Sequence, residues 1–210
     1  KGIPAGVPSV AQRLRDAGYR TVGISGSPIV RDAGSPARHN QHGGYEIGFD
    51  VFETLDCTAA ECRWRHKPPA ERINQRAFVH LDMAREDSRP LFHYLHYMDV
   101  HYPYRQPSHA ARPFTAGRPA SAEWVEAGDA TPIANVLRGR SDPIGHTDAD
   151  VAYLRDSYDD AIHYFDGEFA ALRAEIERVG LSGDTLIVLL SDHGESFLDH
   201  GTMKPVSYTH

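Results

Sequence analysis

Apolar residues recur along the chain with two different periods. Spacings of three and four predict a helix over Ser9–Ala17 and another over Pro69–Arg85. The apolar stretches Arg20–Ser25 and Leu91–Met98 predict strands, and a shorter strand is expected over Phe49–Phe52. Helices and strands that alternate in this way imply a doubly wound α/β sheet.

The second half of the chain holds the longest helical pattern and the most apolar run. Thr147–Val179 predicts one long helix, with Gly167 as a candidate bend. Leu186–Leu190 is too short for a buried helix and predicts a strand buried on both faces in the middle of a parallel sheet. Residues Arg105–His146 lack periodicity apart from a helical turn expected near Trp124. They are expected to form a lid or insertion over the sheet edge.

Alternation within Leu91–Met98 assigns its side chains to two faces. His93 and His96 lie inside this strand and are expected to be structural. One face carries Phe92, Tyr94, His96 and Met98, and the other carries His93, Leu95 and Tyr97.

Composition narrows the class of protein. The chain has 210 residues, 40% of them hydrophobic and 10% aromatic, which is typical of a globular rather than a disordered protein. A net charge of -7 without a basic stripe argues against binding to nucleic acid or anionic membranes. No run approaches the ~18 apolar residues of a membrane span. The 13 histidines suit metal or anion chemistry.

Two features of the sequence do not determine the cellular location of the protein. Cys57 and Cys62 are equally compatible with a local disulfide and with free thiols, and one short-spaced pair does not fix the redox environment. Lys1 rather than Met stands first, so the natural N-terminus is expected upstream. A periplasmic or secreted location is compatible with the sequence, which does not determine the oligomeric state.

The segment after Leu186–Leu190 carries the first candidate chemistry. The apolar run stops at Asp192 and His193, and ligands of open α/β sheets bind beyond the carboxyl ends of strands. A carboxylate and an imidazole on a turn permitted by Gly194 are suited to a divalent metal. The alternative is a helix N-cap beside a surface histidine. The nearby pair Asp199-His200 favours the metal interpretation.

The strand Leu91–Met98 ends in a similar way, at Asp99 and His101. Both strand ends are expected to meet in one crevice at the same sheet edge. Asp99 is either a metal ligand or a residue that orients His101 or caps a turn. His101 is either a donor to a leaving oxygen or a packed strand histidine. Three further aspartates, at 159, 160 and 166, are expected on the solvated or packing face of the long helix.

These motifs resemble a known family. YMDVHYPY, then SYDDAIHYFD, then TLIVLLSDHGESFLDHG, together with GVPSVAQRLRDAGYRTVGIS and GFDVFE, are similar to the sulfatases of the alkaline phosphatase superfamily. The resemblance implies a three-layer, doubly wound, mostly parallel α/β sheet and residues 1–205 as part of one catalytic domain. It also implies a metal-dependent sulfuric ester hydrolase acting on a small anionic sulfate ester. The alternatives are a phosphonate monoester hydrolase, a phosphoethanolamine transferase, or a catalytically inert fragment.

The resemblance also implies roles for single residues. Asp192 and His193 match a late pair of metal ligands, usually for calcium and sometimes for magnesium or manganese. His101 matches the histidine that contacts the sulfate and the leaving oxygen, and Lys204 is the candidate for a catalytic lysine. Glu195 and His200 are expected to support the ligands. Cys57 stands in DCTAAEC rather than in a Cys/Ser-x-Pro-x-Arg motif and is rejected as the nucleophile.

The family's nucleophile and first two aspartate ligands lie upstream of the segment that opens this chain. We therefore expect the fold to be incomplete and the chain to be an internal piece of such an enzyme, inactive by itself. Residues 206–210, VSYTH, match a translated transposase adaptor end and are expected to be a sequencing artefact.

Overall fold

The computed structural model describes residues 7–32, 44–57, 67–121, 123–126 and 146–198. The chain divides into two compact units. The first unit consists of Lys1–Met98 and Glu168–Thr185, and the second of Asp99–Gly167 and Leu186–His210. Each unit has an apolar core of its own.

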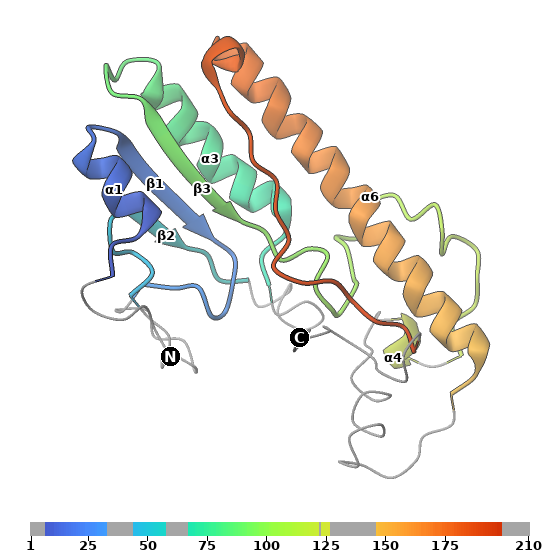
Figure 1. Ribbon diagram of the computed structural model, residues 1–210. Coiled ribbons are helices and arrows are strands. Elements are labelled where there is room, and N and C mark those ends of the chain that lie inside the picture. The colour runs from blue at the N-terminus through green and yellow to red at the C-terminus, as the bar shows by residue number, and fades with distance from the viewer. Residues whose placement is uncertain (1–6, 33–43, 58–66, 122, 127–145, 199–210) are drawn as a thin grey trace. The chain divides into compact units, whose positions relative to one another are not determined.

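A parallel sheet forms the centre of the first unit (Figure 1). Its strands are β1 (Arg20–Ser25), β2 (Val51–Thr54) and β3 (Leu91–His96), in the order β2-β1-β3. Strands β1 and β3 begin at the residues predicted from the sequence, whereas β2 begins two residues later than predicted. Every residue of the central strand β1 is buried.

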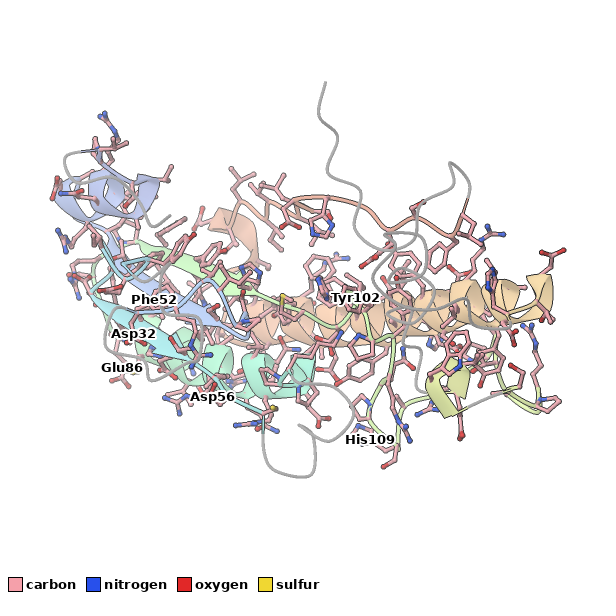
Figure 2. The ribbon with its side chains drawn as sticks, turned by 90° about the horizontal axis from the view of Figure 1, so that it is seen from below. Asp32, Phe52, Asp56, Glu86, Tyr102 and His109 are labelled. Carbon is pink, nitrogen blue, oxygen red and sulfur yellow. The ribbon has the colours of Figure 1, made fainter. Side chains whose placement is uncertain are left out.

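Helices lie on both faces of this sheet. Figures 1 and 2 place α1 (Val10–Asp16) and α3 (Ala70–Ala84) on opposite sides of it, which makes a three-layer α/β arrangement. Ser9 caps α1 by accepting a hydrogen bond from the backbone N–H of Gln12 at 3.0 Å. Gly18, at φ 91°, follows the helix in the left-handed region.

One face of the sheet packs on α3 and on the last part of α6 (Asp148–Arg178). The long helix expected over Thr147–Val179 is confirmed, and it runs through Gly167 without interruption. A short 3₁₀ helix, Ser182–Asp184, follows it. The core cluster contains Val22 and Ile24 of β1, Ile73, Ala77 and Leu81 of α3, and Leu172, Ile176 and Val179.

Aromatic rings cover the other face of the sheet. Phe49 stacks on Phe92 with ring centroids 5.9 Å apart and lies 6.2 Å from Tyr94. A Cβ on Gly23 would lie 2.5 Å from Cδ2 of Phe52, so this strand position requires glycine. Leu95 packs against the core on the other side of the sheet, so the predicted alternation of β3 is confirmed.

The second unit packs around the first half of α6. Its buried cluster consists of Tyr104, Val151, Leu154 and Phe197. The helical turn expected near Trp124 is present as α4 (Glu123–Glu126), and Val125 within it is completely buried.

Hydrogen bonds attach the described part of the 105–146 insertion to α6. Asp160, which is completely buried, accepts them from the backbone N–H groups of Phe114 and Thr115 at 3.0 and 3.2 Å and from the Thr115 hydroxyl at 2.5 Å. Gln106 donates to the Ser157 carbonyl at 3.2 Å. Asp160 was expected on a solvated or packing face, and its role in holding the insertion is a finding of the structure.

The strand predicted at Leu186–Leu190 is wrong for this structure. The segment has no strand assignment, and Leu186, Val188 and Leu190 are 88%, 66% and 84% exposed. A strand needs a hydrogen-bonded neighbour and side chains that cover its faces, and no described strand pairs with this segment. The apolar character of Leu186–Leu190 does not by itself provide a neighbouring strand or covering side chains.

Three further expectations concern Cys57, membrane-spanning helices and the C-terminal residues. Cys57 is disulfide-bonded, which decides between the two alternatives left open for it, and its partner lies outside the described residues. Within the described ranges, no helix has the length and apolar character needed to cross a membrane. Lys204, His200, Asp199 and residues 206–210 lie outside the described residues.

Candidate active site

Two histidines meet in the second unit. His101 follows β3, and His193 follows the exposed Leu186–Leu190 segment. Their ring centroids are 6.2 Å apart and their planes make an angle of 65°. The expected convergence of these two side chains is therefore present, although the segment before His193 is not a strand.

Hydrogen bonds fix the tautomers of both rings. Nδ1 of His101 lies 2.7 Å from the carbonyl oxygen of Tyr102, and Nδ1 of His193 lies 3.0 Å from that of Gly194. Because a carbonyl oxygen only accepts, Nδ1–H is the donor in each case. In the neutral rings Nε2 carries the lone pair, which is the arrangement found when a histidine binds a metal through Nε2.

Asp192 completes a pair of candidate ligands with His193. Its Oδ2 lies 3.8 Å from Nε2 of His193, and the two side chains are 84% and 32% exposed. Metal–ligand bonds of about 2.0–2.4 Å place neighbouring ligand atoms about 3–3.5 Å apart, so a small movement would let both bind one ion. The donors therefore fit part of a divalent metal site. Among the described residues no group of three such ligands occurs.

A buried tyrosine contacts the same segment at Glu195. Tyr104 is 1% exposed, and its hydroxyl donates to Oε2 of Glu195 at 2.9 Å. Its ring lies 5.4 Å from that of Tyr158 and 5.6 Å from that of Phe197. Burial, and then the negative charge of Glu195, raise the pKa of the Tyr104 phenol far above its usual range, so the hydroxyl remains a donor.

The chain is similar to one known protein family over nearly its whole length. A family model described as sulfatase matches residues 1–208. The chain belongs to the sulfatase family. No curated protein sequence matches this sulfatase-family chain.

The solved structures similar to it include two of phosphonate monoester hydrolases. The enzyme of Agrobacterium radiobacter is 18% identical with a TM-score of 0.60, and that of Silicibacter pomeroyi is 19% identical with a TM-score of 0.63. Each match covers 96% of this chain and 50% of the other, so the chain spans about half the length of these structures. The likeness shows an incomplete alkaline phosphatase-like α/β fold, as expected from the sequence.

The structure brings together some of the predicted residues of the sulfatase-family site. His101, Asp192, His193 and Glu195 lie in one part of the second unit. Asp99 is buried in the same unit, with 2% exposed. The roles of these residues and of Lys204 remain predictions.

Sequence reasoning missed Tyr104, because a tyrosine in an aromatic-rich motif is indistinguishable from core packing before its partner is known. Its position three residues after His101 was the available signal.

Proposed function

We propose that this sulfatase-family protein hydrolyses small sulfate esters with the help of a divalent metal, most simply calcium. The observation that carries the proposal is the convergence of His101 on the Asp192–His193 pair, with both imidazoles donating through Nδ1 to backbone carbonyls. Asp192 and His193 would supply two of the metal's ligands. The metal would offset the negative charge that gathers on the oxygens of the sulfate in the transition state.

His101 is proposed to act on the leaving oxygen. Its Nδ1–H is engaged with the Tyr102 carbonyl, so only Nε2 is available for proton transfer. A protonated Nε2 would donate to the oxygen that leaves with the alcohol, and the neutral ring would result. The contact with Tyr102, whose ring stacks on His101 at 4.5 Å, restricts the imidazole to this orientation. Lys204 is proposed as a second cationic group at the substrate oxyanion.

A second candidate is hydrolysis of phosphonate monoesters. Both solved structures named above are described as phosphonate monoester hydrolases. Sulfate monoesters and phosphonate monoesters both present a tetrahedral anionic centre with a leaving oxygen. The proposed roles of His101, Asp192 and His193 are the same for either substrate.

The test uses the protein extended by its adjoining sequence, since the nucleophile is expected there. We expect turnover of 4-nitrophenyl sulfate that a chelator abolishes. Asp192→Ala should lose both metal and activity. His101→Ala should keep the metal but lose about 10²–10⁴-fold in kcat, the range for a general acid. His163→Ala is the matched control, because His163 is exposed on α6.

The outcomes separate the candidates. Faster turnover of 4-nitrophenyl phenylphosphonate than of the sulfate would favour the second candidate. Loss of metal from His101→Ala with retention in Asp192→Ala would contradict the assignment of roles, and full activity in the presence of chelator would contradict both candidates.

A further inference from the structure

The segment that carries Asp192 and His193 is held in the protein core at its C-terminal end. Its first residues are exposed, and the chain becomes buried only at Ser196 and Phe197, which are 3% and 7% exposed. The side-chain hydrogen bonds of residues 191–194 in the described structure are local, such as that from the Ser191 hydroxyl to the His193 carbonyl at 2.5 Å. The position of His193 therefore depends on how the following residues are held.

Glu195 is the residue at which this segment enters the core of the second unit. Its carboxylate accepts the hydrogen bond of Tyr104 across 91 residues of sequence. Tyr104 stands three residues after His101, and Glu195 stands two residues after His193. The hydrogen bond between Tyr104 and Glu195 therefore links the two short segments that carry His101 and His193.

The phenol that donates this bond is itself restrained. The rings of Tyr158 and Phe197 lie 5.6 Å apart, and each packs against Tyr104. Leu154, which is completely buried, belongs to the same cluster. Aromatic rings packed in this way allow the hydroxyl little movement, so it can define the position of its acceptor.

We propose that Tyr104 is a positioning residue, which sets the distance between His101 and the Asp192–His193 pair through its hydrogen bond to Glu195. Its effect on catalysis rests on the proposed function, whereas its effect on geometry does not. Removal of the hydroxyl takes this hydrogen bond from Glu195, and we expect the segment 191–195 to shift away from His101 as a result. Groups that hold metal ligands from outside commonly change metal affinity or activity by ~10–100-fold.

Four variants test the geometry. Tyr104→Phe and Glu195→Leu remove the hydrogen bond, while Glu195→Gln keeps an oxygen that accepts it. Tyr158→Phe is the matched control, because this tyrosine belongs to the same ring cluster and the described part of the chain records no hydrogen bond for its hydroxyl. The measurement is the nuclear Overhauser effect between the imidazole protons of His101 and His193 in the metal-free, 210-residue chain.

The expected result is loss of this signal in Tyr104→Phe and Glu195→Leu and its retention in Glu195→Gln and Tyr158→Phe. Retention in Tyr104→Phe, or loss in Tyr158→Phe to the same degree, would overturn the proposal.

In the extended protein, Tyr104→Phe should raise the Kd for calcium ~10–100-fold, and Tyr158→Phe should leave it within about twofold. If neither substrate is hydrolysed, the proposed function fails while the signal between the histidines still decides the role of Tyr104.

Discussion

Two segments of this chain were both predicted to be strands and have different surroundings in the structure. These are β1, RTVGIS, and the segment Leu186–Leu190, LIVLL. β1 is buried at every position and pairs with a parallel strand on each side. In the second segment the exposed fractions of the side chains from Leu186 to Leu190 lie between 42% and 88%. Hydrophobicity therefore shows which segment benefits from burial, and the neighbours decide whether burial occurs.

The difference is large in energetic terms. Burial of one Val, Leu or Ile side chain contributes about 1.5–3 kcal/mol, so five of them amount to roughly 7–15 kcal/mol. This is comparable with the whole stability of a typical domain. β1 buries two such side chains, Val22 and Ile24, which contribute about 3–6 kcal/mol, whereas the five side chains of Leu186–Leu190 contribute only a small part of their possible total. Contiguous exposed apolar side chains of this kind mark surfaces that associate.

The largest expected effect comes from truncating one apolar side chain in each segment. Ile24 is completely buried and Leu186 is 88% exposed. Ile24→Ala should lower the free energy of unfolding by about 2–5 kcal/mol, through lost burial and the cavity left behind. Leu186→Ala should change it by less than about 0.5 kcal/mol. Urea denaturation of the two variants measures both values, and equal losses would show that the exposed segment is packed in solution.

The comparison also explains which predictions from sequence were correct. Helix α1 carries local signals, namely the cap at Ser9 and the left-handed Gly18. Both β1 and Leu186–Leu190 need partners that are distant in sequence. β1 finds them in β2 and β3, whereas no described strand pairs with Leu186–Leu190, and a run of apolar residues does not specify which outcome occurs. The proximity of His101 and His193 was expected from two similar motifs, but the reason given for it, two parallel strands that end at one sheet edge, is wrong because Leu186–Leu190 is not a strand.

The contacts of Asp160 and Tyr104 were not predictable. Their partners lie 45 to 46 residues away in a segment without periodicity, and 91 residues away after a long helix. No local spacing encodes such pairs.

Glycine positions give a second, smaller contrast. A Cβ on Gly23 would lie 2.5 and 2.8 Å from two ring carbons of Phe52, whereas a Cβ on Gly194 would meet no atom within 4 Å. Gly23→Ala should cost about 1–3 kcal/mol by overpacking. Gly194→Ala should leave the free energy of unfolding within about 0.5 kcal/mol of the parent. Thermal denaturation of both variants is the measurement, and a stable Gly23→Ala protein would mean that Phe52 moves away without cost.

The buried side of β3 should make stability depend on pH. Burial, then the nearby His80 and Arg20, lower the pKa of His93 to about 3, and its Nε2 has no hydrogen-bond partner among the described residues. Below an unfolded pKa of about 6.5 the unfolded chain binds a proton that the folded chain does not. Stability is therefore fully present above pH 6.5 and falls by up to about 1.4 kcal/mol per pH unit from there toward pH 3.

The variant His93→Leu should remove this part of the slope. The free energy of unfolding in urea at pH 7 and at pH 5.5 measures it, with His163→Leu on the exposed face of α6 as the control. Glu53, which accepts a hydrogen bond from His80 at 2.7 Å and opposes the lowering of the His93 pKa, is unchanged in both variants. An unchanged slope in His93→Leu would assign the pH dependence to other groups.

The smallest expected change in stability comes from charging the exposed segment. Val188 and Leu190 are 66% and 84% exposed, so a lysine at either position keeps its ammonium in water. Val188→Lys and Leu190→Lys should leave the free energy of unfolding within about 0.5 kcal/mol of the parent, while self-association in sedimentation and binding of a hydrophobic dye both decrease. The same substitution at Val22 in β1 would place the charge in the core and should prevent folding. A loss of more than about 1 kcal/mol in Val188→Lys would instead mean that TLIVLL packs against the protein in solution, as β1 does, and that hydrophobicity alone had identified the strand correctly.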